Sequence, residues 1–184
     1  RENSFVSECQ DGVDNDGDDY ADAADFSCTS KQVRYENEPA RSGVTPNYFV
    51  CDCQAGADGN CIQGNDANTG TSSQAPFRTF EKARSLMNTI NAGQTIGLCK
   101  GGAFTPGTSG QIFNSRCRAH APCTLRDYTP HWASGDEARP LVTITVGDAL
   151  RFEDGAAPDP DGGYHVLNLR LRGAGENYGV KVYN

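Results

Sequence analysis

Residues 64–96 carry the clearest structural signal of the chain, GNDANTGTSSQAPFRTFEKARSLMNTINAGQTI. Apolar side chains recur there every three or four positions, the spacing of one face of an amphipathic helix: Phe77, Phe80, Ala83, Leu86, Met87 and Ile90. Thr79 is placed to cap this helix, because its hydroxyl can accept a hydrogen bond from a free N–H group of the first turn. Gly93 is placed to stop it, since glycine tolerates the left-handed conformation beyond a helix end. We expect the apolar face to pack in the core.

After this helix the apolar residues alternate with polar ones, which predicts short β-strands. The runs lie at residues 95–98, 141–146, 150–152, 166–171 and 180–183. Ile144 and Leu169 are 25 residues apart, and Phe152 and Val182 are 30 apart. Repeats of that length, each a strand and a turn, suggest a solenoid. A β-sandwich with long loops would give a similar pattern.

The composition narrows the classes of protein to consider. The chain has 184 residues, 16 Lys plus Arg, 24 Asp plus Glu and a formal charge of −8, which disfavours nucleic-acid binding. No apolar run is long enough for a transmembrane helix, and we expect any signal peptide to have been removed. The 21 glycines and 9 prolines fit many turns and short strands better than a helical bundle.

The chain contains eight cysteines and no C-x-x-C motif. An even and high count favours four disulfides and an extracellular, cell-surface or periplasmic location, with a bacterial source expected. We expect Cys9 to pair with Cys28 and Cys117 with Cys123, whereas the spacing does not determine how Cys51, Cys53, Cys61 and Cys99 pair. The alternative is a set of reduced cysteines or a zinc site with His120 or His131.

An Asp-rich loop between Cys9 and Cys28 has the most specific chemistry in the sequence. Counted from Asp14, oxygen ligands fall at the positions that wrap Ca²⁺ in an EF-type loop: the carboxylates of Asp14, Asp16, Asp18, Asp22 and Asp25, and the backbone carbonyl of Tyr20. Carboxylates packed this closely repel one another unless a divalent cation lies among them. The segment resembles the calcium loops of thrombospondin repeats and dockerins, although position 6 is Asp19 in place of the usual glycine. We expect a structural Ca²⁺ site; the alternative is a disordered acidic tail.

The second acidic turn, residues 154–163, is expected to be a solvated loop.

Four consecutive segments together resemble one family: Gly64–Thr71, Pro76–Ala83, Ala92–Ile96 and Gly101–Phe104. They are similar to the N-terminal region of right-handed parallel β-helix proteins of the pectate-lyase-like superfamily. The sequence departs from that pattern at Gln94, at Phe104 and in the Cys-rich insertion between Cys51 and Cys61. The resemblance implies an all-β fold, the first rungs of a right-handed parallel β-helix, with the helix from Phe77 as an N-terminal cap over the first rung.

On this basis we expect three zones. Residues 1–30 form the calcium-binding segment, residues 31–76 a Cys-rich irregular lead-in, and residues 77–184 the capping helix and first rungs. Disulfides and bound calcium would stabilise the irregular N-terminal part, which has little core of its own. Two or three rungs would leave a bare final edge, so we expect the chain to be part of a longer protein or one unit of an assembly.

The resemblance implies work on polysaccharides, but we find no catalytic constellation in these residues. Arg151, Arg170 and Arg172 are expected on solvated strand faces, and Tyr128 and Trp132 in packing. His120, His131 and His165 are scattered along the chain. We therefore expect a non-catalytic extracellular structural or surface-assembly role, with self-assembly, further rungs or a polysaccharide as partner. The alternative is the N-terminal part of a secreted polysaccharide lyase or hydrolase whose active site lies beyond residue 184.

Overall fold

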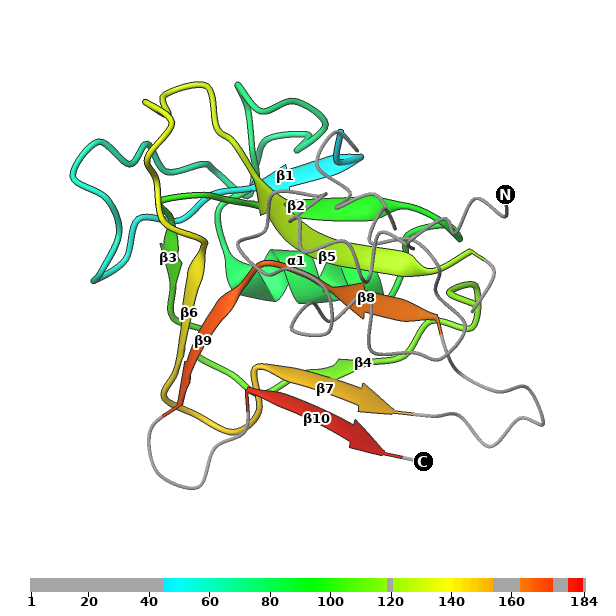
Figure 1. Ribbon diagram of the computed structural model, residues 1–184. Helices are drawn as coiled ribbons and strands as arrows, with labels where there is room; N and C mark the ends of the chain where they lie inside the picture. Colours follow the sequence, from blue (N-terminus) through cyan, green and yellow to red (C-terminus); the bar gives the residue numbers. More distant parts are fainter. Residues whose placement is uncertain (1–44, 119–120, 154–162, 174–178, 184) are drawn as a thin grey trace, which may run out of the picture. The chain divides into compact units, whose positions relative to one another are not determined.

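The computed structural model describes residues 45–118, 121–153, 163–173 and 179–183, all in the second of two units into which the chain divides after Val44. These residues form ten strands and one short helix (Figure 1). The elements are β1 (Tyr48–Val50), α1 (Phe80–Met87), β2 (Thr95–Cys99), β3 (Ala103–Phe104), β4 (Gln111–Ile112), β5 (Cys123–Tyr128), β6 (Leu141–Ile144), β7 (Leu150–Glu153), β8 (Tyr164–Val166), β9 (Arg170–Gly173) and β10 (Val180–Tyr183).

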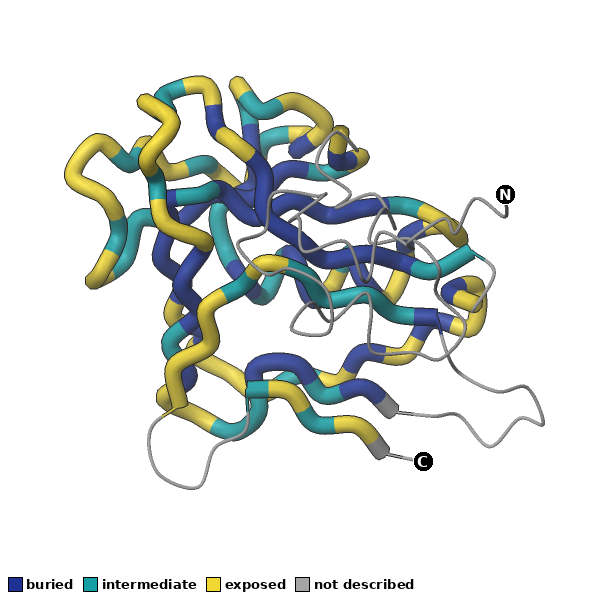
Figure 2. The backbone as a smooth tube through the Cα atoms, in the orientation of Figure 1, coloured by how far each residue is buried: buried dark blue, intermediate teal, exposed yellow. Residues whose placement is uncertain are grey.

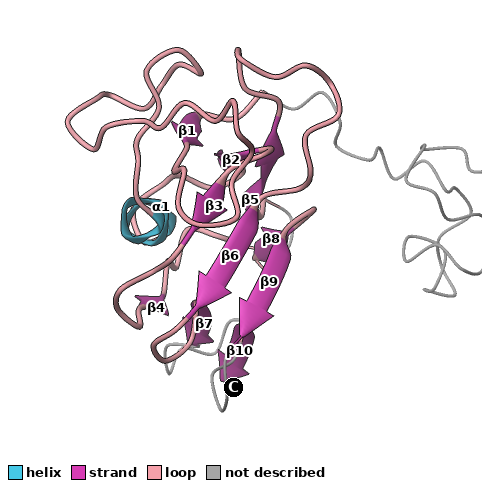
Figure 3. Cartoon of the chain, turned by 90° about the vertical axis from the view of Figure 1, so that its left-hand side faces the viewer, coloured by secondary structure: helices cyan, strands magenta, loops and turns pink. Residues whose placement is uncertain are grey.

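The strands form three parallel sheets, with the orders β1-β2-β5-β8, β3-β6-β9 and β4-β7-β10. From β2 onward the chain passes through the three sheets in the same sequence three times, and we call each passage a circuit. Each strand therefore pairs with its counterpart in the next circuit, as β3, β6 and β9 do in Figure 3. This parallel pairing does not fit the β-sandwich alternative.

The apolar side chains of the three sheets pack in one core. The largest fully buried strand residues include Ile96, Leu98, Phe104, Ile112, Leu125, Ile144 and Leu150. Figure 2 shows that burial is concentrated in the first two circuits, whereas β9 is exposed along its length. The core therefore consists mainly of side chains from the first two circuits, and the third circuit contributes few buried side chains.

Residues with a positive φ lie at corners between the β1-β2-β5-β8 sheet and the β3-β6-β9 sheet. Gly101, between β2 and β3, has a φ of 72°, and Asn168, between β8 and β9, has a φ of 55°. The sequence predicts one strand over residues 166–171, and this prediction is wrong, because the corner at Asn168 divides it into β8 and β9. Asparagine adopts the left-handed region more readily than most residues, so it can make the turn.

Helix α1 has the predicted cap residue, Thr79, so it begins at Phe80 and not at Phe77, and it ends earlier than predicted. Thr79 is the N-cap, and its hydroxyl accepts a 3.2 Å hydrogen bond from the backbone N–H of Lys82. Phe80, Ala83 and Met87 lie buried against the first circuit, in contact with β1, β2 and β4. The helix stops at Met87, with Asn88 as its C-cap, well before Gly93.

Candidate functional site

Most of the site residues expected from the sequence lie outside the described residues. This applies to the calcium ligands Asp14, Asp16, Asp18, Tyr20, Asp22 and Asp25, to Cys9 and Cys28, and to residues 154–162 of the second acidic turn. Calcium binding and the Cys9–Cys28 bridge therefore stay predictions.

The six described cysteines form three disulfides: Cys51–Cys99, Cys53–Cys61 and Cys117–Cys123. The structure thus joins Cys117 to Cys123, the pairing expected from the sequence, and places this bridge at the start of β5. No thiol among the described cysteines is free to ligate zinc with His131. His120 lies outside the described residues.

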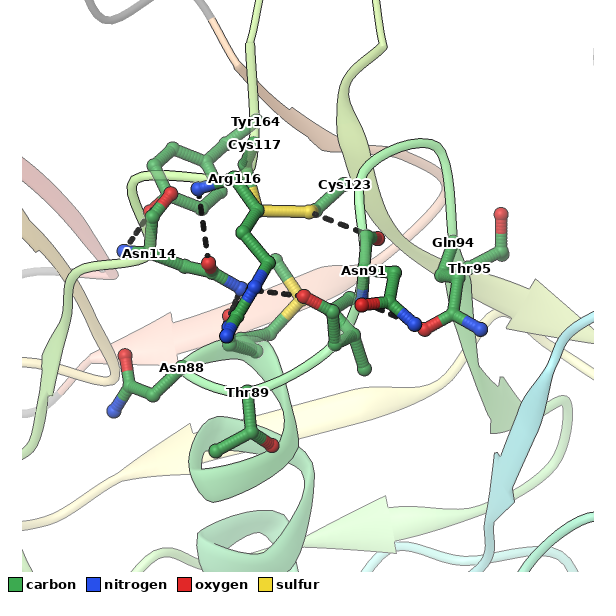
Figure 4. Close-up of a disulfide and its surroundings, with 12 residues drawn as sticks. Asn88, Thr89, Asn91, Gln94, Thr95, Asn114, Arg116, Cys117, Cys123 and Tyr164 are labelled. Atoms are coloured by element: carbon green, nitrogen blue, oxygen red, sulfur yellow. Dashed lines mark hydrogen bonds between the residues drawn. A yellow bond between two sulfur atoms is a disulfide. The ribbon is translucent and has the colours of Figure 1, made fainter.

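Asn114 lies beside the Cys117–Cys123 bridge and holds the end of the helix (Figure 4). Its buried side-chain amide donates 2.9 Å hydrogen bonds to the carbonyl oxygens of Met87 and Ile90. Its backbone N–H donates at 2.6 Å to the hydroxyl of Tyr164 in β8. The last carbonyls of a helix have no partner within it, and Asn114 satisfies that of Met87 together with the Ile90 carbonyl just beyond the helix. Asn114 therefore links the helix end to the third circuit.

A second polar cluster surrounds Asp127, which is buried near the end of β5. Its carboxylate lies 3.6 Å from Lys100 Nζ and 3.6 Å from Arg126 Nη2, and it accepts a 3.3 Å hydrogen bond from the side-chain amide of Asn168. A buried carboxylate is tolerated when cations and donors surround it. These residues come from all three circuits, so the cluster links the circuits at one corner.

The aromatic residues Tyr128 and Trp132, which the sequence analysis expects in packing, both contact neighbouring groups. Tyr128 is buried with its ring edge-on to Phe49, 4.9 Å between centroids, and burial raises the pKa of its hydroxyl. Trp132 lies against the corner at Gly101, where an added Cβ would come within 2.9 Å of the indole ring. Tyr128 is therefore part of the core, whereas Trp132 is half-buried and packs against it.

Those basic and histidine residues singled out from the sequence that the structure describes lie on different elements. Arg170 and Arg172 are exposed on β9, and Arg170 Nε donates to the carbonyl oxygen of Arg139 at 2.8 Å. Arg151 is half-buried on β7. His131 is exposed, with Nδ1 3.1 Å from the carbonyl oxygen of Ser73, and His165 lies half-buried on β8.

The most distinctive surface in the described part of the chain is the edge formed by β8, β9 and β10, which we call the last-circuit edge. Each of these strands is the outermost strand of its sheet. Large apolar side chains are exposed on β9 and β10: Leu171 is 36 % exposed, Val180 43 % and Val182 67 %. Outer strands with exposed apolar side chains readily pair with other strands. At the opposite end, β1 covers the first circuit in one sheet and α1 packs beside it.

Comparisons with known proteins do not indicate a function, so the functional argument rests on the last-circuit edge. The chain matches no protein-family model and no curated protein sequence. Among the described residues, no helix has the length and apolar character needed to cross a membrane.

Proposed function

We propose that the chain forms the cap and first rungs of a right-handed parallel β-helix of the pectate-lyase-like kind. The threefold passage through parallel sheets supports this proposal, as does a helix packed on the first circuit. The stretch from Gly64 to Phe104, whose segments resemble the family, contains that helix and the first two strands of the first circuit, β2 and β3.

The role that fits these residues best is a non-catalytic, structural one outside the cell, in which the last-circuit edge serves as an assembly surface. Three outermost strands carry this proposal, two of which expose large apolar side chains: Leu171 on β9, and Val180 and Val182 on β10. Their edges can pair with strands of another molecule or of a later part of the same polypeptide. Three disulfides support an extracellular location, because reducing compartments rarely retain such bonds. A Ca²⁺ ion bound by residues 14–25 completes the proposed extracellular module.

Sedimentation of the chain with one charge placed on this edge tests the assembly role. Wild-type protein should self-associate with rising concentration, and Val182→Lys should shift it towards monomer, because a buried lysine would have to lose its hydration at the contact. Val146→Lys is the matched control: Val146 is 50 % exposed and lies in the second circuit, between β6 and β7, and not on the three edge strands. A wild-type chain that stays monomeric at high concentration, or equal effects of the two substitutions, would contradict the proposal.

A further inference from the structure

Two disulfides lie next to each other where β1 and β2 end. Cys51 directly follows β1 and is bonded to Cys99, the last residue of β2, across 48 residues of sequence. Cys53 is bonded to Cys61, only 8 residues away. One bridge therefore ties the paired strands together, and the other closes a short loop beside it.

The two bridges differ in how far solvent can reach them. Cys51 and Cys99 are both 0 % exposed, and a Cβ added to Gly102 would come within 2.4 Å of Cys99 Sγ. Cys53 and Cys61 are half-buried. A reagent in solution therefore meets the Cys53–Cys61 bridge first, since exchange depends on access to the sulfur that is attacked.

Cys61 connects the two bridges. The Sγ atoms of Cys51, Cys61 and Cys99 all lie within 4.8 Å of one another, and this group of three leaves out Cys53. Cys61 Sγ also lies 3.6 Å from the carbonyl oxygen of Asp52, the residue between Cys51 and Cys53. A thiolate at Cys61 would thus be almost in contact with both sulfurs of the buried bridge.

We propose that Cys61 is a relay through which thiols in solution exchange with the buried Cys51–Cys99 bridge. A dithiol first reduces Cys53–Cys61: it gives two electrons, is itself oxidised to a disulfide, and leaves thiols at both cysteines. The Cys61 thiolate then attacks one sulfur of Cys51–Cys99. A Cys61–Cys51 or Cys61–Cys99 bond forms, the old bond breaks, and the remaining cysteine leaves as a thiolate, with no net change of oxidation state.

The same exchange gives a route by which the long bridge can form during oxidative folding. Closing a loop of 8 or 10 residues costs less chain entropy than closing one of 48. Cys61 therefore pairs early with Cys51 or Cys53, and exchange within the cluster can pass the bond on to Cys99. An extracellular thiol or a disulfide oxidoreductase is sufficient to start this exchange.

A matched pair of variants tests the relay. Cys53→Ser and Cys61→Ser both remove the Cys53–Cys61 bridge and each leaves one free thiol, but only Cys53→Ser keeps the thiol inside the three-sulfur group. Each variant is incubated with dithiothreitol well below its melting temperature, quenched with acid, alkylated and mapped by mass spectrometry. The half-time for loss of the Cys51–Cys99 bond should be longer in Cys61→Ser than in Cys53→Ser.

Partial reduction of the wild-type chain supplies a second readout that does not depend on how the variants fold. Peptide mapping should find an intermediate in which Cys53 is alkylated and Cys61 is bonded to Cys51 or Cys99. Equal half-times in the two variants, or a wild-type reaction that passes through no such intermediate, would overturn the proposal.

Discussion

At the scale of single residues, Asp66 shows how one carboxylate fixes the start of a helix. Its Oδ1 accepts hydrogen bonds from the backbone N–H groups of Arg78 at 2.8 Å and Thr79 at 3.0 Å, and its Oδ2 accepts from the Thr79 hydroxyl at 2.7 Å. Thr79 in turn caps α1. Burial alone would raise the pKa of Asp66, but these hydrogen bonds and the nearby Lys82 charge outweigh it and hold the pKa below its usual value.

Asp66→Asn should therefore destabilise the fold by about 1 kcal/mol at neutral pH, a modest value because the group is exposed to solvent. The folded-state pKa lies below the unfolded one, so the ionised group stabilises the fold above about pH 4, and this contribution is lost as the pH falls further. Urea denaturation at pH 7 and pH 3 measures both effects. Asp58→Asn, which removes the charge of a carboxylate that accepts only the local Asn60 N–H, is the control. A gap between wild type and Asp66→Asn that does not shrink at pH 3 would contradict this account.

Asn168 is a second residue whose role depends on backbone conformation. Its φ of 55° strains most side chains, and its amide donates to Asp127. Asn168→Ala and Asn168→Gly both lose that hydrogen bond, but only glycine adopts a positive φ freely. Asn168→Ala should be less stable than Asn168→Gly by about 1 kcal/mol. Thermal unfolding of the two variants measures the difference, and equal melting temperatures would show that the corner is not held in this conformation.

At the scale of secondary structure, periodicity predicted those elements in which one face is apolar. The start of α1 and the strands β2, β6, β7 and β10 are of this kind. β5 was missed because two adjacent charged residues, Arg126 and Asp127, interrupt its alternation. They pair with each other, and Asp127 also contacts Lys100 and Asn168 from elsewhere in the chain. Strands β3 and β4 have only two residues each, too few to show a period.

The end of α1 was mispredicted for a related reason. The apolar pattern continues to Ile90, but the carbonyls of Met87 and Ile90 accept from Asn114, and Asn88 donates to the carbonyl of Gln111 in β4. These partners lie more than 20 residues away in sequence, so no local pattern could reveal them.

The Asp-rich loop of residues 14–25 is predicted to stabilise the protein by binding Ca²⁺. If their carboxylates bind Ca²⁺, excess EGTA should lower the melting temperature, because a ligand that binds only the folded state stabilises it. Asp14→Asn combined with Asp16→Asn should lower the melting temperature and abolish the effect of EGTA. Asp159→Asn combined with Asp161→Asn, in the second acidic turn, should leave the effect of EGTA unchanged. An identical melting temperature with and without EGTA would rule out a stabilising ion.

For the described fold as a whole, the two ends differ, and this limits how copies can meet. The first circuit has β1 paired to β2 and α1 packed beside it, whereas the last circuit has no described neighbour beyond β8, β9 and β10. A contact between two copies is therefore expected to join one last-circuit edge to another. Such a contact uses the same surface on both sides and is related by a two-fold axis.

A two-fold contact of this kind would bring Arg170 and Arg172 of one copy near those of the other, since both side chains are exposed on β9. Like charges oppose association, and salt screens them over about 8 Å at physiological ionic strength. Self-association should therefore strengthen between about 50 and 500 mM NaCl, a range over which the screening length falls several-fold. Arg170→Gln combined with Arg172→Gln should associate more tightly at low salt and lose most of the salt dependence, whereas Arg116→Gln, exposed near the Cys117–Cys123 bridge, should behave as wild type. Association that weakens with salt would indicate a contact between opposite charges, and so a different surface on at least one side.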